Sequence, residues 1–382
     1  MMNPLLPVFV AGLVPLSLAP VYVGLMEGIA EFTASLLKLY SGRISDRLRR
    51  RKSLVVLGYG LSSVARPAVA LAAAGWQVIL LKFVDRTGKG LRTSPRDALI
   101  GDSVDPSARG LAFSFHRGMD HLGAVLGPLA AMALLLATLG QPGAAPEPRP
   151  SPSEMEVLRF IFAVALVPGL LATLALILCV REVAPVEAPS SDGRERPLDR
   201  GFYGFVTAAS VFALGNSSDM FLMLWARTGF GFSLLQIAAL WVALHLSKVI
   251  FSLPGGLLSD RVGRRPLILG GWMLYALVYL GLAVADRSWH LWVLLVIYGA
   301  YYGLAEGAEK ALVTDLVPGS ERGRAFGIYH AAVGLAALPA SLLFGIFWAW
   351  LGAARAFGIG AVLAAVAMVL LWGTPLGSRA EA

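Results

Sequence analysis

The side chains that could do chemistry in this sequence are charged residues inside apolar segments. Asp85, Lys89, Arg92 and Arg96 lie within the segment 76–101 and are spaced by four, three and four residues. On a helix this spacing places them on one stripe. A charge at the middle of a membrane-spanning helix costs about 2.5–3.5 kcal/mol, so it is kept where it pairs or binds a ligand. The three cations outnumber the one carboxylate, which favours binding of an anionic group.

Other ionisable and polar side chains lie at similar depth in further apolar segments. We predict substrate contacts at Lys89, Arg92, Arg96, Arg117, Asn216, Trp241, His245, Lys248 and Glu306. We predict proton exchange at Glu27, Glu31, Asp120, Asp219 and Glu309. Burial makes a carboxylate hold a proton more readily and a nearby cation has the opposite effect, so an arriving anion can capture or release a proton.

Two other interpretations of these charges stay open. The charges can pair internally around a neutral or cationic substrate, or the site can take a metal ion, although no His, Cys or Asp spacing matches a metal site. Gly88-Lys89-Gly90 is not a nucleotide-binding loop, because Phe83 stands where the first glycine belongs and Gly90 follows the lysine in place of Ser or Thr. No nucleophile and base are arranged for an enzyme, and we expect no cofactor. Energy would therefore come from an ion gradient or the substrate gradient.

The composition indicates an all-α membrane protein. The chain is 57% hydrophobic and 15% charged, with a mean hydropathy of +0.70, against about 45–50% and about 25% in soluble domains. Apolar segments long enough to span a bilayer recur along the whole chain. They lie at 1–17, 20–44, 53–73, 76–101, 109–138, 157–180, 202–227, 231–257, 266–285, 290–314, 322–349 and 354–373.

The net charge of +8 is gathered in short loops and in the segment 182–200, which argues against nucleic-acid binding. Basic loops mark the cytoplasmic side, so both termini are expected in the cytoplasm and the protein in the inner membrane, as a monomer in the lipid bilayer.

The single Cys179 forms no intrachain disulfide. The tryptophans near segment ends are predicted to be interfacial anchors, with Trp241 considered for the cavity. They are Trp225, Trp241, Trp272, Trp289, Trp292, Trp348 and Trp350.

The two halves of the chain repeat one plan. Residues 42–51 return as residues 256–265, and residues 102–113 return as residues 315–326. The two matches have the same offset in the numbering to within one position. A membrane protein built twice from one plan is most often a transporter. We expect an N-terminal six-helix bundle (1–181), a cytoplasmic linker (182–201) and a C-terminal six-helix bundle (202–382).

Aligning the two halves by this repeat shows that they do not begin at equivalent positions. Met1 aligns with Gly215, so residues 202–214 have no counterpart in the N-terminal half. We therefore expect that the first helix lacks its cytoplasmic half, through a late start codon or a shortened chain. The alternative is that the first helix is simply short.

The repeated basic loop, Gly-x-x-x-Asp-Arg-x-Gly-Arg-Arg in its second copy, resembles the signature loop of the major facilitator superfamily. The first copy has Arg49 where the second glycine is usual. The resemblance covers the whole chain and implies two six-helix bundles related by a pseudo-twofold axis, a central cavity and alternating access. The loop's charges can pair across the bundle with the acidic ends of the fourth and tenth spans. This predicts a gate at Asp46, Arg47, Asp102, Asp260, Arg261 and Asp315, unless the loops serve topology alone.

A second motif indicates the direction of transport. Gly123-x-x-x-Gly127-Pro128 is similar to the antiporter motif of proton-coupled exporters in this superfamily, although Leu129, Ala130 and Ala131 replace the usual following glycines. Ordinary close packing of helices is the alternative. We predict a proton-coupled exporter of a small, anionic organic compound. An importer that moves a proton with an anionic nutrient or metal chelate, and a non-transporting binding or signalling protein of the same fold, remain alternatives.

Overall fold

In the computed structural model, the described residues are 2–48, 51–103, 109–139, 147–182, 198–317 and 322–375, and they fold almost entirely into helices. Two short 3-10 segments, Leu16–Leu18 and Val69–Leu71, adjoin them. The α-helices are α1 (Leu6–Leu13), α2 (Ala19–Leu48), α3 (Arg51–Ala68), α4 (Gly75–Asp102), α5 (Arg109–Leu139), α6 (Pro152–Val164), α7 (Leu166–Cys179), α8 (Arg200–Gly215), α9 (Asp219–Phe230), α10 (Leu234–Val262), α11 (Arg264–Val284), α12 (Ser288–Asp315), α13 (Arg322–Leu351) and α14 (Ala353–Gly373).

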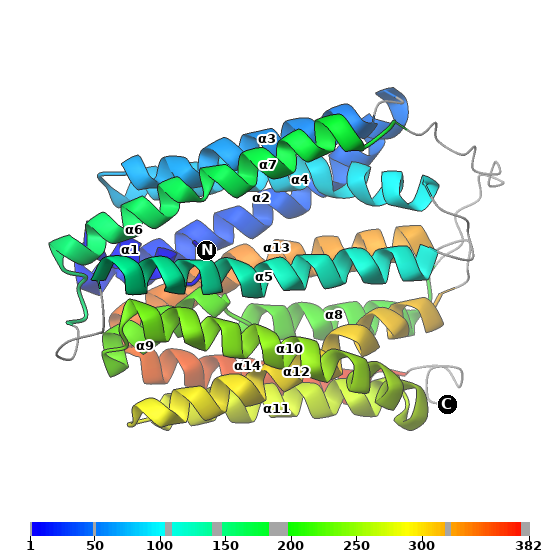
Figure 1. Cartoon of the computed structure of the whole chain (residues 1–382). Helices are drawn as coiled ribbons and strands as arrows, with labels where there is room; N and C mark the ends of the chain where they lie inside the picture. The colour runs from blue at the N-terminus through cyan, green and yellow to red at the C-terminus, as the bar shows by residue number, and fades with distance from the viewer. Residues whose placement is uncertain are drawn as a thin grey trace.

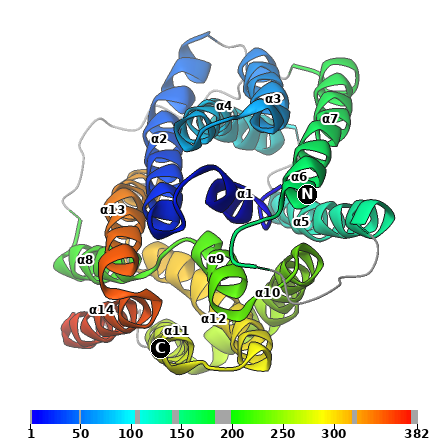
Figure 2. The same ribbon diagram turned by 90° about the vertical axis from the view of Figure 1, so that its left-hand side faces the viewer.

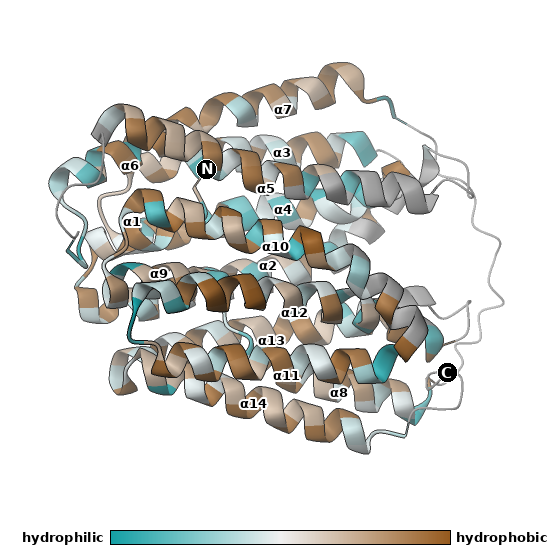
Figure 3. Ribbon diagram, turned by 60° about the horizontal axis from the view of Figure 1, so that its bottom comes forward, coloured by the Kyte–Doolittle hydropathy of each residue, from teal (hydrophilic) through white to brown (hydrophobic). Residues whose placement is uncertain are grey.

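The helices lie side by side along one direction, as in a protein that spans a membrane (Figure 1). Within the described residues, seven helical segments are long and apolar enough to cross a bilayer. They are Arg51–Leu71, Pro152–Cys179, Leu234–Ser252, Arg264–Val284, Ser288–Val313, Ala325–Leu351 and Ala353–Gly373. Figure 3 shows hydrophobic residues predominating along the helices and hydrophilic ones toward their ends. Helices α2 and α4 also have the length to span a bilayer but carry several charges each.

The helix bounds repeat with the offset found in the sequence. Helices α4 and α12 have equal lengths, and both ends of α12 follow those of α4 by the offset that relates residues 102–113 to residues 315–326. The starts of α3 and α11 differ by the same offset, and so do the starts of α5 and α13. This offset also pairs α1 with α9, because Leu6 then corresponds to Asp219. The two halves of the chain therefore share one order of helices over these elements.

The segment predicted as one span at 202–227 is broken into two helices, which corrects that prediction. Helix α8 ends at Gly215, and Asn216 has an extended backbone. The Ser218 side chain then accepts a hydrogen bond from the Met220 backbone N–H and begins α9. Asn and Ser side chains compete with the helix for backbone hydrogen bonds, which explains the break. Helix α9 ends at Gly231, whose φ of 65° lies in the left-handed region.

Helices from the two halves of the chain pack against each other along their length. Helix α2 lies against α13, α5 against α10, and α1 and α2 against α9. Figure 2, an end view, shows α1 near the centre with α2, α6 and α9 around it. The α2–α13 contact depends on small residues, because a Cβ on Gly24 would collide with the Ser341 carbonyl oxygen. This close approach of two backbones fixes how the halves meet.

Replacing Gly24 with alanine should therefore destabilise the protein. The added methyl group meets a backbone oxygen that cannot move aside, and overpacking of this kind costs about 1–3 kcal/mol. The matched control is Gly60→Ala, because nothing lies within 4 Å of a Cβ built there. Thermal unfolding of purified protein in detergent should show a lower Tm for Gly24→Ala and no loss for Gly60→Ala. Equal Tm values for the two variants would contradict the packing.

Candidate functional site

Ion pairs join α4 to α2 inside the bundle. Lys82 Nζ lies 2.9 Å from Glu27 Oε1, and both side chains are almost fully buried. Arg86 Nη1 lies 3.0 Å from Glu31 Oε1, and Lys89 Nζ lies 3.6 Å from the same oxygen. Buried charges of opposite sign compensate each other's lost hydration only when the geometry is close. The two glutamates of α2 are thus held by a row of cations on α4.

A further pair ties α4 to α3. Arg66 Nε donates to Asp85 Oδ1 at 2.8 Å. The Asp85 side chain is buried, whereas half of the Arg66 side chain is exposed. The Ser62 hydroxyl donates to the Asp85 backbone carbonyl at 3.1 Å and accepts a bond from Arg92. Asp85 belongs to the predicted stripe, but its charge is used by an arginine from the next helix.

Arg92 differs from the other cations of α4, because its contacts are neutral. Its Nη1 donates to the Ser62 hydroxyl at 2.7 Å and to the Gly58 carbonyl at 3.3 Å. Its guanidinium carbon lies 4.2 Å from the centre of the Tyr59 ring. The side chain is 8% exposed, and no described carboxylate lies within ion-pair distance of it. A buried cation without a counter-charge is costly, so Arg92 favours an anion beside it.

The remaining members of the predicted cation set have other surroundings. Arg96 donates to Asp97 Oδ1 from Nε at 2.9 Å and from Nη2 at 2.8 Å. The side chain of Arg117 lies outside the described residues. Asp120, a predicted proton site, is largely exposed, and its Oδ2 lies 3.7 Å from His116 Nε2. Of the stripe at 85, 89, 92 and 96, only Arg92 lacks an oppositely charged partner within the described part of the chain.

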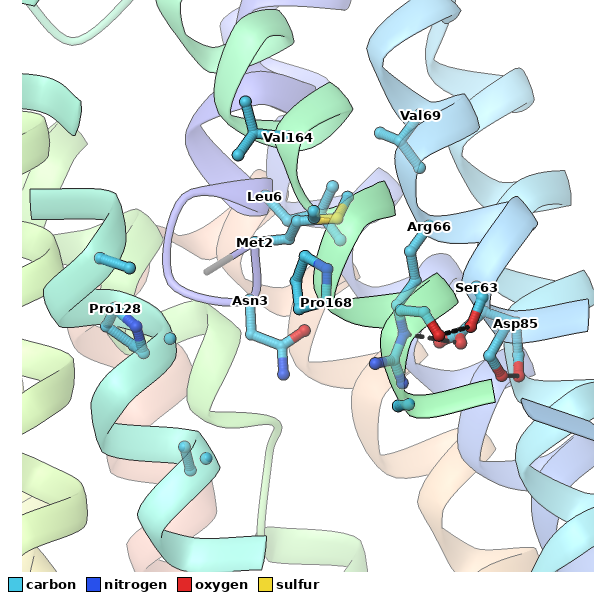
Figure 4. A pocket seen from close by; sticks show the side chains of 18 of the residues that line it. Met2, Asn3, Leu6, Ser63, Arg66, Val69, Asp85, Pro128, Val164 and Pro168 are labelled. Carbon is cyan, nitrogen blue, oxygen red and sulfur yellow. Dashed lines mark hydrogen bonds and ion pairs between the residues drawn. The ribbon is translucent and has the colours of Figure 1, made fainter. Parts of the chain in front are cut away.

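A cavity of about 980 Å³ borders this network. Its charged lining comes from Arg66, Lys82, Asp85 and Arg92, and it reaches Met2 and Asn3 near the start of the chain. Figure 4 shows Arg66 and Asp85 on one side of the space, with Asn3, Pro128 and Pro168 around it.

Trp241 and His245 of α10 also line the cavity. Their rings stack with centroids 4.6 Å apart. The cavity thus receives side chains from both halves of the chain, and cations predominate among its charged lining groups.

The second half of the chain places polar groups around the break between α8 and α9. Lys248 Nζ donates to Asp219 Oδ2 at 2.6 Å and lies 3.8 Å from the centre of the Tyr302 ring. Asn216 exchanges long hydrogen bonds of 3.4 Å with the hydroxyls of Tyr298 and Tyr301. Asn216, Asp219 and Lys248, which were predicted site residues, are therefore close together.

Glu309 lies on α12 among neutral hydrogen-bond donors. Trp272 Nε1 donates to Oε1 at 2.8 Å, and the Tyr329 hydroxyl donates to Oε2 at 2.7 Å. Its neighbour Lys310 pairs instead with Glu306 at 2.7 Å. No described cation lies within ion-pair distance of Glu309. The carboxylate is thus held by two donors that carry no charge.

The interfacial role predicted for Trp272 is wrong. Its side chain is fully buried, stacks on Phe212 at 4.6 Å and serves Glu309. An indole N–H needs a partner when it is buried, and a carboxylate one helix away supplies it. The sequence signal for this burial was that Trp272 lies inside the segment 266–285 and not at its end, and that the following segment carries charged residues.

The predicted gate is described only in part. The side chains of Asp46, Arg47, Asp102, Asp260 and Arg261 lie outside the described residues. Asp315 is described, and its Oδ2 accepts a bond of 3.3 Å from Arg264 Nε. Arg264 belongs to the same basic loop as Arg261, at the start of α11.

Two contacts that the sequence did not suggest cross between the halves of the chain. The Ser218 hydroxyl donates to Glu27 Oε2 at 3.1 Å, and Arg227 Nη2 donates to Glu154 Oε2 at 2.6 Å. Arg227 is fully buried, and its Nη1 donates to the Phe232 carbonyl at 3.1 Å. Spacing along one helix cannot reveal such contacts, because the partners lie far apart in the sequence.

A bundle of long apolar helices around buried charges and a helix broken within a span is the architecture of a membrane transporter. The family model of the Major Facilitator Superfamily matches residues 1–247 and 207–381. The chain belongs to this superfamily, and it is a multi-pass membrane transporter rather than an enzyme.

Known proteins agree with this assignment. An uncharacterized MFS-type transporter of Methanocaldococcus jannaschii is 30% identical over 383 residues, which cover 97% of this chain and 89% of that protein. The inner membrane transport protein YajR of Escherichia coli is 31% identical over 185 residues, or 47% of this chain and 39% of YajR. The crystal structure of a D-xylose-proton symporter has a similar fold, with a TM-score of 0.79 at 16% identity over 99% of this chain and 94% of that one.

Removing one donor from Glu309 should destabilise the protein. In Tyr329→Phe, the buried Oε2 loses its hydroxyl partner, and an unsatisfied buried acceptor costs about 1–3 kcal/mol. The matched control is Tyr203→Phe, because Tyr203 is 46% exposed. Unfolding in detergent should show the loss for Tyr329→Phe alone. Equal losses in both variants would show that the hydroxyl does not serve the carboxylate.

Proposed function

We propose that the protein is a proton-coupled secondary transporter that exports a small anionic organic compound by alternating access. The observation that carries this proposal is Arg92, a buried guanidinium with neutral partners at the edge of a cavity. In a membrane interior, such a charge is expensive unless a counter-charge joins it. A substrate anion would supply that counter-charge.

The overall arrangement that we propose is two six-helix bundles related by a pseudo-twofold axis, joined by the linker 182–201. The shared helix bounds of α4 and α12, and of α5 and α13, support this arrangement. We place the end of the bundle where α2 and α10 finish in the cytoplasm, because the two arginine loops follow there. The opposite end, where α6 begins and α9 finishes, then faces outward. One chain supplies both bundles, so a monomer is sufficient.

The charge balance around α4 also supports an anionic substrate. The cations Arg66, Lys82, Arg86 and Lys89 pair with the carboxylates Glu27, Glu31 and Asp85, whereas Arg92 bonds to Ser62. Five cations against three carboxylates leave an excess of positive charge in this group. Internal pairing, the main alternative from the sequence, accounts for every cation in the group except Arg92.

For the proton we propose Glu309. Its carboxylate is buried and bonded to two neutral donors, so protonation would remove a charge that forms no ion pair with a described cation. Arg92 and Glu309 lie on α4 and α12, the helices that correspond in the repeat. A conformational change that alters hydration at both helices could therefore link anion and proton.

Export is supported by the Gly123–Pro128 motif within α5, which resembles that of proton-coupled exporters. Symport is a second candidate, and a specific observation favours it. Arg92 and Glu309 carry opposite charges without charged partners among the described residues, and one anion plus one proton would neutralise both together. The similar fold of a D-xylose-proton symporter agrees with either direction.

Replacing Arg92 with glutamine should weaken anion binding about ten- to a hundredfold, because a hydrogen bond to a charged group contributes about 1.5–3 kcal/mol. Binding is measured by the thermal shift of purified protein against a panel of small carboxylates, phosphates and neutral analogues. Arg355→Gln is the control, since Arg355 is exposed at the start of α14.

Three results of that experiment have distinct meanings. A selective loss of anion binding in Arg92→Gln supports the proposal. Equal losses for anions and neutral analogues would overturn the role of Arg92. Stabilisation by an anion with no flux in vesicles would identify a binding protein in place of a transporter.

The direction of proton movement separates export by antiport from symport. In proteoliposomes with a trapped pH dye, adding the anion outside should make the lumen more alkaline if entering substrate exchanges for a proton. Symport would make it more acidic. The sign is the same for both orientations of the protein in the vesicle, and Arg92→Gln vesicles control for passive leakage of the protonated acid.

A further inference from the structure

We infer that α9 is a separately held outer segment, clamped to the first half of the chain at both ends by a carboxylate. Ser218, its N-cap residue, is bonded to Glu27 of α2, and Arg227, in its last turn, is bonded to Glu154 of α6. Ser218 and Arg227 are then positioning residues for α9. This inference rests on the proposed transport function and specifies how its site communicates with the outer side.

The break before α9 makes such a segment possible. Helix α8 does not continue into α9, because residues 216–218 leave the helical conformation. The second half of the chain holds that break from its own side: Tyr275 donates to the Gly215 carbonyl at 2.8 Å, and Ser217 shares a bond of 2.8 Å with Tyr279. Helix α9 itself is held from both halves. Lys248 of α10 bonds to Asp219 at its start, and the first half adds the bonds from Glu27 and Glu154 and the contact with α1 (Figure 2).

The inner clamp shares its carboxylate with the candidate substrate site. Glu27 Oε1 faces Lys82, and Glu27 Oε2 accepts the bond from Ser218. Lys82 belongs to the row of cations on α4 and lines the cavity. Hydrogen bonds to an ionised group are roughly twice as strong as neutral ones. A substrate anion that attracts Lys82 would weaken its pairing with Glu27. The bond from Glu27 to Ser218, which holds the N-cap of α9, would then change as well.

The outer clamp is built around a charge that needs a partner. Arg227 is fully buried, and the partly exposed Glu154 supplies its counter-charge at 2.6 Å. Glu154 is held in place by the start of α6, where its carboxylate accepts the Ser151 backbone N–H and the Ser151 hydroxyl accepts the Glu154 N–H. A capping box of this kind fixes the direction of the carboxylate. Opening the outer side between α6 and α9 would have to separate this pair.

The clamp can be tested without any substrate by measuring the distance between α6 and α9. Spin labels are placed at Glu156→Cys and Thr228→Cys after Cys179→Ser, and double electron–electron resonance is recorded in lipid nanodiscs. Glu156 is exposed on α6 and Thr228 is partly exposed on α9. Ser218→Ala and Glu154→Gln should each raise the population at longer distance several-fold. Gln at position 154 keeps the capping box, because Gln also serves there.

Two matched variants decide what such a change means. Ser217→Ala removes a buried hydroxyl beside Ser218 whose bond stays within the second half, and it should leave the distances unchanged. Ser218→Thr retains the hydroxyl and should restore the original distribution. The inference is overturned if Ser218→Ala and Glu154→Gln both leave the distances unchanged, or if Ser217→Ala has the same effect as Ser218→Ala.

A transport measurement then separates this inference from the proposed function. In vesicles, Ser218→Ala should lower the ratio of protons to substrate moved while retaining substrate flux, because the inner clamp no longer ties α9 to the cation row. An unchanged ratio of protons to substrate would show that Ser218 has no role in coupling, even if the α6–α9 distances change. Distances that respond in a protein without anion flux would leave the clamp standing and refute the proposed function.

Discussion

The cost of placing charge in an apolar layer controls the first half of this structure. Lys82 and Glu27 can be buried only because they lie 2.9 Å apart. That pairing fixes the face of α4 toward α2, and polar contacts continue it along the helices: the Ser41 hydroxyl donates to the Gly90 carbonyl at 2.9 Å, and the Ser94 hydroxyl donates to the Lys38 carbonyl at 2.8 Å. The position of Arg92 follows from this register.

The second half meets the same cost with different chemistry. Around Glu309 the compensation comes from an indole and a phenol, within a cluster of buried aromatic rings that includes Phe212, Tyr275 and Tyr301. Neutral donors stabilise a carboxylate without committing it to a permanent ion pair. The two halves share helix bounds but differ in what surrounds their charges. The repeat therefore accounts for the arrangement of the helices, and the differences between the halves account for the distinct surroundings of Arg92 and Glu309.

The sequence predicted where most helices lie better than it predicted which side chains their charges would pair with. Period and apolar length depend on residues close in sequence, and the repeat of the two halves reappears in the helix bounds of α4 and α12. The pairing of Lys89 with Glu31 and the burial of Trp272 depend on which helices become neighbours. The break at 216–218 left a local signal, because its Asn and Ser side chains all compete for backbone bonds. It was missed because the flanking apolar residues suggested one continuous span.

Arg227 limits the conformations that the transporter can adopt. A guanidinium with no exposed surface cannot simply lose Glu154, since an uncompensated buried charge is strongly destabilising. Any state in which α6 and α9 separate must therefore give Arg227 water or another acceptor. Its place in the last turn of α9, next to the left-handed Gly231, lies at the end of the helix where water is closest in the proposed topology. Opening toward the outside would hydrate Arg227 as it breaks the ion pair, so the gain in hydration would offset part of the cost of losing Glu154.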